Sequence, residues 1–248
     1  MDTLVDLVNH GILPFVGRED ESARLVRFWR ETLDAQGLRA FLVVGEAGVG
    51  KSRLAAHIEK LVAEGKGAVV HARLYPESST SIAPILAEAI ASADADLRLL
   101  RSDPEGNIGD VAAALRRLCR LRPTLVIIED VHLLEGEALR ETARLLGSLT
   151  DETLSLLCFA RPVELPVRSV LQPWLVQEMM LEGLGRAELS TLWTDLFGGA
   201  SPNGELARLR QVTRGNPLAL RTVLRALLPA SRDRLSTDLV VNEEMLGA

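Results

Sequence analysis

Residues Gly45–Ser52 have the types and spacing G-x-x-x-x-G-K-[ST], which is the pattern of a phosphate-binding P-loop. Its three glycines allow backbone angles that a Cβ would forbid, so the chain can close around a phosphate. A helix starting after the loop would point its first amides and the positive end of its dipole at the anion. We expect Lys51 to reach the β- and γ-phosphates and the Ser52 hydroxyl to hold Mg²⁺. A glycine-rich turn with a coincidental Lys-Ser is the alternative, and it is disfavoured because the chain has only three lysines.

These residues, together with the one that follows them, form the predicted phosphate-binding set. Its members are Gly45, Glu46, Ala47, Gly48, Val49, Gly50, Lys51, Ser52 and Arg53.

Two adjacent carboxylates, Glu129 and Asp130, end the most hydrophobic run of the chain, residues 124–128. That run is apolar and β-branched, as a strand covered on both faces should be. Ligand groups collect at the carboxyl ends of parallel strands, so the pair matches a Walker B element. One carboxylate would hold Mg²⁺ through water, and the other would orient or deprotonate an attacking water. By position Glu129 takes the metal role and Asp130 the water role. The reverse stays open because Asp more commonly comes first, and a solvated strand end is the alternative for both.

Three further residues each have a functional and a structural interpretation. Arg161 follows a strand expected between the P-loop strand and the Walker B strand, so its guanidinium would face the γ-phosphate and distinguish ATP from ADP. A surface arginine before a proline is the alternative. His132 either senses the γ-phosphate side or is a loop residue bonded to backbone. Pro217 either only starts a helix or packs by the nucleotide base.

The elements that position these residues alternate between strands and helices and then become helical only. Strands are expected over 39–44, 68–74, 124–128, 154–159 and 176–181, with helices over 19–35, 51–64, 82–93, 108–121 and 137–149. Pro166 and Pro173 predict an irregular stretch before the last strand, and 1–14 could make a short helix. Residues 186–196, 203–213 and 217–228 follow as helices. This predicts an α/β fold with a parallel five-stranded sheet, helices on both faces, and a small all-helical lid. For the strands we expect the order of a P-loop sheet, 5-1-4-3-2.

The expected domains are therefore a nucleotide-binding α/β domain over 1–183, a helical lid over 184–230, and a tail over 231–248 leading to a further domain. Net charge is −6, which argues against a generally basic surface, though not against a local basic patch, and we expect no direct nucleic-acid binding. We see no signal peptide and no apolar run long enough to span a bilayer, which predicts a cytoplasmic protein without membrane contact. Cys119 and Cys158 lie in apolar runs without metal spacing and are expected to be free thiols.

The order of the motifs resembles that of STAND NTPases, signal-transduction ATPases with numerous domains in the AAA+-like branch of P-loop proteins. Within this group, the sequence motifs are most similar to those of the ATPase modules of large LuxR-type regulators and multidomain bacterial sensors. The resemblance spans residues 14–228. Besides the P-loop, the segments that carry it are 14–19 (PFVGRE), 127–132 (IIEDVH), 161–162 (RP) and 215–220 (GNPLAL).

The resemblance implies a switch that is closed when ADP is bound and open when ATP is bound, and that hydrolyses ATP slowly with Mg²⁺. Such switches often self-associate. They control an effector or a transcription-regulatory output through other domains of a longer protein. Phe15, Val16 and Gly17 would line the adenine side, with Arg18 beside them in the nucleotide-binding set. Arg161 would take the sensor-one position and Pro217 would contact the base. One departure is Leu133, where many relatives carry a Trp, and another is that the usual repeat array and effector domain do not follow.

Two other functions compete with the switch. An AAA+ ATPase ring related to replication initiators or loaders would need an arginine finger that we cannot assign, and it would favour a basic surface. A P-loop kinase would need an acceptor site, and nothing in 76–106 indicates one.

Overall fold

The structure is a computed structural model that describes residues 15–76, 81–93, 107–163, 166–197, 199, 201 and 204–230. The chain divides into two compact units. Unit 1 comprises Met1–Asp20, Ala47–Gly50 and Glu182–Ala248, and unit 2 comprises Glu21–Glu46 and Lys51–Leu181. The helix expected within 1–14, the segment 94–106 and the tail 231–248 lie outside the described residues.

Unit 2 is built on a five-stranded parallel sheet in the order β2-β3-β4-β1-β5. This is the order 5-1-4-3-2 read from the other edge, so the prediction is confirmed. The strands are β1 (Leu38–Gly45), β2 (Ala68–Arg73), β3 (Thr124–Glu129), β4 (Leu154–Ala160) and β5 (Leu175–Leu181). Arg73 pairs in register with Glu129, so the carboxyl ends of β2 and β3 end side by side.

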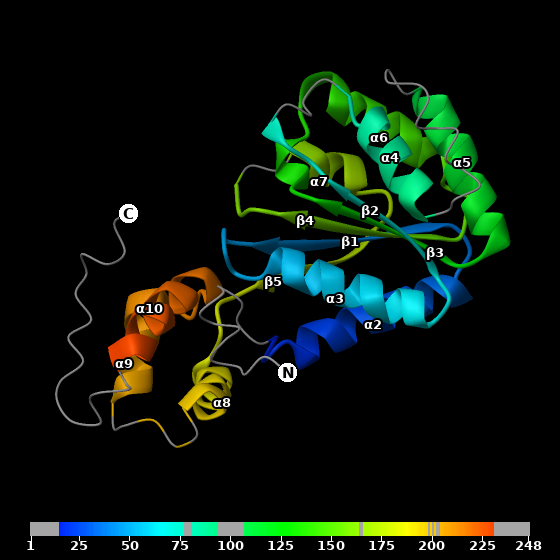
Figure 1. Ribbon diagram of the computed structural model, residues 1–248. Helices are drawn as coiled ribbons and strands as arrows, with labels where there is room; N and C mark the ends of the chain where they lie inside the picture. Colours follow the sequence, from blue (N-terminus) through cyan, green and yellow to red (C-terminus); the bar gives the residue numbers. More distant parts are fainter. Residues whose placement is uncertain are drawn as a thin grey trace. The chain divides into compact units, whose positions relative to one another are not determined.

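The helices of unit 2 cover both faces of this sheet (Figure 1). On one face lie α2 (Glu19–Asp34), which begins in unit 1, and α3 (Lys51–Glu64). On the other lie α4 (Ala83–Ala93), α5 (Ile108–Leu121), α6 (Gly136–Ser148) and α7 (Pro166–Leu171). The stretch before the last strand was predicted to be irregular because of Pro166 and Pro173, and this was wrong for residues Pro166–Leu171, which form α7. Pro166 is its first residue, where a missing N–H costs nothing and the fixed φ favours the helix.

Local chemistry explains the start of α5 and the character of the strands. The Asn107 side chain accepts a hydrogen bond from the Gly109 amide at 2.8 Å, which satisfies one of the free donors of the first turn. Strands β3 and β4 are buried at every position, as continuous apolar runs covered on both faces should be.

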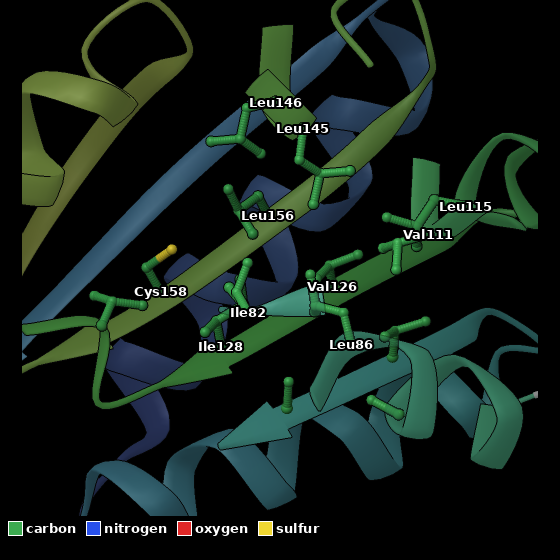
Figure 2. Packing of buried hydrophobic residues seen from close by; sticks show 14 of the residues in the cluster. Ile82, Leu86, Val111, Leu115, Val126, Ile128, Leu145, Leu146, Leu156 and Cys158 are labelled. Atoms are coloured by element: carbon green, nitrogen blue, oxygen red, sulfur yellow. The ribbon is translucent and has the colours of Figure 1, made fainter. Parts of the chain in front are cut away.

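The main core packs α4, α5 and α6 onto β3 and β4 (Figure 2). Leu86 and Leu115 come from two of the helices and Ile128 from β3. Cys158 of β4 lies in this core, and burial raises the pKa of its thiol to about 12. Cys119 is half-buried with its pKa raised by burial to about 11, and both cysteines are free.

Unit 1 has a separate apolar core made by its own helices, α8 (Arg186–Phe197), α9 (Glu205–Thr213) and α10 (Pro217–Ala230). Leu189 and Leu220 are buried in it, and Val16 packs against it from the segment before α2. None of the helices among the described residues is long and apolar enough to cross a membrane.

Candidate functional site

Lys51 is the first residue of α3, and its side chain turns back toward the end of β1. Its Nζ donates to the carbonyl oxygens of Gly45 at 2.7 Å and Glu46 at 2.9 Å, and the residue is only 8% exposed. Burial lowers the pKa of this ammonium, the negative charge of Asp130 raises it, and the positive charge of Arg161 lowers it. The loop therefore holds a cation near both the Walker B carboxylates and Arg161.

Glu129 is the last residue of β3 and is buried. Burial alone would raise the pKa of its carboxyl, but hydrogen bonds from His71 and Ser52 outweigh burial, and the pKa lies below its usual range. The Ser52 hydroxyl and the Glu129 carboxylate thus come together, as residues sharing one Mg²⁺ site must.

Asp130 lies just past β3 in the left-handed region, with φ 59° and ψ 35°. This backbone angle turns the chain after the strand. Asp130 accepts a hydrogen bond from Arg73 Nε at 3.2 Å, and its other oxygen lies 3.9 Å from His132 Nδ1. The two carboxylates therefore have different partners and different surroundings.

Mg²⁺ commonly takes one or two carboxylates, phosphates and water rather than a cage of protein ligands. Ser52 and Glu129 offer oxygen donors of that kind. Across the parts of the chain that the structure describes, no group of three or more His, Cys, Asp or Glu side chains could hold a metal ion. The residues present fit a magnesium ion held jointly with a nucleotide.

Arg161 and His132 complete this side of the site. Arg161 follows β4 directly and is exposed, and its charge lowers the pKa of both Lys51 and His132. The Nδ1 atom of His132 is buried and makes no hydrogen bond, and burial is the main cause of the lowered pKa of its imidazole. His132 therefore has no backbone partner at this atom.

The sequence interpretation missed three polar residues around the Walker B pair. His71 and Arg73 of β2 contact Glu129 and Asp130 respectively, and Glu59 of α3 contacts His71. The sequence did contain one indication of these contacts. His71 and Arg73 are two residues apart, so they lie on one face of a strand that ends beside the Walker B strand.

Gly17 and Arg18, just before α2, have close contacts within unit 1. Gly17 has φ +66°, and a Cβ there would lie 2.0 Å from Glu188 Cγ, so only glycine fits. Arg18 is buried, and its Nη2 donates to the carbonyl oxygens of Val49 at 3.0 Å and Glu182 at 2.6 Å. Two of the predicted nucleotide-binding residues, Arg18 and Val49, are thus bonded to each other. Phe15, before them, is 36% exposed.

The start of α10 contacts the tip of the P-loop within unit 1. Asn216 caps the helix, because its Oδ1 accepts from the Leu218 amide at 2.9 Å. Its Nδ2 donates to the Ala47 carbonyl oxygen at 2.7 Å, and the Leu218 amide is 3.3 Å from the Gly48 carbonyl oxygen. The sequence interpretation singled out the neighbouring Pro217, whose Cγ lies 4.0 Å from where a Cβ of Gly50 would be, and missed Asn216.

Comparison with protein families finds a match to the AAA ATPase domain over residues 14–159, more than half of the chain. The chain belongs to the AAA ATPase domain family. A P-loop AAA+-like module was predicted from the motifs, and that prediction is confirmed.

Solved structures share the fold of this AAA ATPase domain. The ORC1 protein of Aeropyrum pernix, in a complex with DNA, has 17% identity and a TM-score of 0.60, with 97% of this chain and 67% of that one covered. Drosophila ORC bound to DNA has 13% identity and a TM-score of 0.63, with 93% and 61% covered. A STAND protein with a tetratricopeptide repeat sensor from Pyrococcus horikoshii has 21% identity and a TM-score of 0.56, with 93% and 32% covered. The chain spans less than two thirds of the last two, and no curated protein matches it significantly.

A test of the Arg161 position in this AAA ATPase domain follows from its charge. Arg161→Ala is expected to weaken ATP binding about tenfold and ADP binding much less, because a guanidinium facing the γ-phosphate favours the nucleotide that carries one. Calorimetry with both nucleotides measures the two changes. Arg168→Ala, which removes an exposed arginine paired with Glu178, is the control. Equal losses for ATP and ADP would mean that Arg161 does not recognise the γ-phosphate.

Proposed function

We propose that this chain is the ATP/ADP-binding switch module of a STAND NTPase, with slow Mg²⁺-dependent hydrolysis. The observation that carries nucleotide binding is the meeting of Lys51, Ser52 and Glu129 at one end of the parallel sheet. Lys51 binds the β- and γ-phosphates, while Ser52 and Glu129 hold Mg²⁺. When bound, Mg²⁺ neutralises phosphate charge. Asp130 orients the attacking water, and Arg161 faces the γ-phosphate.

The contacts within unit 1 support a switch. Asn216 and Leu218 bond to main-chain oxygens of the P-loop tip, and Arg18 bonds to both that tip and Glu182. A change in the loop when a phosphate binds or leaves must alter these bonds. We infer that residues 184–230 act as a lid on the nucleotide domain 1–183, and that 231–248 lead to further domains carrying the output.

The nucleotide retained after purification tests the switch. A switch closed with ADP should keep ADP through purification, and denaturation followed by chromatography would reveal it in near-stoichiometric amount. A preparation that carries no nucleotide, yet turns over added ATP rapidly, would contradict the switch and favour a turnover machine.

Pro217 gives a kinetic test of the lid. In the proposal Phe15, Val16 and Gly17 line the adenine side and Pro217 contacts the base. Pro217→Ala should destabilise the closed state by about 1–2 kcal/mol, since it removes a rigid apolar contact and frees the start of α10. ADP should leave roughly tenfold faster with little change in its association rate. Stopped-flow release of a labelled ADP measures this, and a release rate equal to that of the wild type would reduce Pro217 to a helix start.

A second candidate function, an oligomeric AAA+ ATPase of the replication-initiator type, is favoured by the fold shared with two ORC proteins bound to DNA. The net charge of −6 favours the switch, and we infer that this module does not bind nucleic acid directly. Fluorescence anisotropy with a labelled DNA duplex at about 0.15 M salt separates the two. Saturable DNA binding whose affinity increases when ATP is added would support the initiator type. Absence of DNA binding would support the switch.

A further inference from the structure

A chain of three side chains links the P-loop helix to the proposed magnesium ligand. Glu59 Oε2 lies 2.6 Å from His71 Nδ1, and His71 Nε2 lies 3.1 Å from Glu129 Oε1. The three residues come from α3, β2 and β3, all within unit 2. None of them except Glu129 belongs to the P-loop or Walker B patterns.

The helix α3 holds Glu129 from two places. Ser52, in its first turn, hydrogen-bonds Glu129 directly, and Glu59, about two turns later, reaches it through the imidazole. His71 thus engages one carboxylate oxygen of Glu129. A carboxylate with one oxygen occupied by an N–H donor can present only a limited set of orientations to a metal ion.

Glu59 determines what His71 can do. Each ring nitrogen of His71 faces a carboxylate oxygen, so in its imidazolium form the ring donates to Glu59 and to Glu129 at once. The Glu59 carboxylate fixes the orientation of the ring, as carboxylate partners of histidines do at metal sites. Without Glu59 the ring could rotate, and its second nitrogen would no longer be directed at Glu129. Glu59 is 42% exposed, so its pairing with His71 contributes little to stability.

We propose that Glu59 and His71 are positioning residues that orient the Glu129 carboxylate for Mg²⁺, with Glu59 acting only through His71. This inference rests on the proposed function, because it assigns Glu129 to the metal. It adds two residues outside the phosphate-binding motifs that determine how strongly nucleotide binding depends on Mg²⁺.

The experiment measures the Mg²⁺ concentration at half-maximal binding of a fluorescent, non-hydrolysable ATP analogue, together with its affinity in EDTA. His71→Ala is expected to raise the Mg²⁺ midpoint about 10- to 100-fold, the usual loss for a partner of a metal ligand. Glu59→Gln should raise it by a smaller factor, roughly three- to tenfold, because the ring remains. Affinity in EDTA should not change in either variant.

A double variant tests the order of action. If Glu59 acts only through His71, the variant carrying both Glu59→Gln and His71→Ala should have the midpoint of His71→Ala alone. His71→Gln keeps an amide donor for Glu129, so it should recover part of the loss and be insensitive to Glu59→Gln. Glu64→Gln, an exposed carboxylate on the same helix paired with Lys60, is the matched control and should leave the midpoint unchanged.

Three results would overturn the inference. They are unchanged midpoints in Glu59→Gln and His71→Ala, additive effects in the double variant, and affinities in EDTA that fall as much as the midpoints rise. These leave nucleotide binding by the wild type intact, so they refute the positioning role alone. Failure of the wild type to bind the analogue at any Mg²⁺ concentration would refute the proposed function and this inference with it.

Discussion

Lys51→Ala is expected to abolish tight nucleotide binding, raising the Kd of a fluorescent ADP analogue by about 100-fold or more. The ammonium lies against the carbonyl oxygens of Gly45 and Glu46, and in the proposed site it is the main cation for the β- and γ-phosphates. Hydrogen bonds to charged groups are worth about 1.5–3 kcal/mol each, so losing those made by one ammonium accounts for a change of this size. Titration of the analogue followed by fluorescence measures it.

The control is Lys60→Ala, which removes a lysine from the same helix at an exposed position paired with Glu64. It should bind the analogue as the wild type does. Since Lys51 also donates to two carbonyl oxygens of the loop, thermal unfolding of both variants shows whether the fold is kept. A folded Lys51→Ala protein with unchanged affinity would mean that this loop does not bind phosphate.

Asp130→Asn is expected to keep ATP bound but slow its hydrolysis by about 100-fold or more, the usual loss when a residue that handles a proton is removed. Asn is the least disruptive substitution because it tolerates the left-handed backbone that Asp130 adopts. Glu129→Gln should instead raise the Mg²⁺ concentration needed for binding. Single-turnover hydrolysis and Mg²⁺ titration measure the two effects.

The surroundings of the two carboxylates support this division of roles. Glu129 is buried against Ser52, the other proposed magnesium ligand, whereas Asp130 is 17% exposed beyond the strand end. Asp151→Asn, at an exposed position away from both, is the control. If Asp130→Asn changed the Mg²⁺ dependence and Glu129→Gln slowed hydrolysis alone, the two roles would be the reverse of those proposed.

The sequence alone determined the family and the sheet, because both depend on local patterns. The P-loop chemistry is contained in the eight consecutive residues Gly45–Ser52, and the strand before it and the helix after it have clear periodicities. The buried run ending at Glu129 marked a central strand. These two motifs indicate a P-loop sheet, for which the order 5-1-4-3-2 was expected, and the structure confirms that order.

Contacts between distant residues were decided only by the tertiary structure. The contacts from Glu59 to His71 and from His71 to Glu129 depend on how α3 is rotated about its axis and on the register of β2 against β3. A local sequence pattern specifies neither of these. Asn216 and Ala47 are 169 residues apart, and their hydrogen bond depends on how unit 1 folds. A local pattern predicts which face of an element is buried, but only packing determines which two polar groups meet on it.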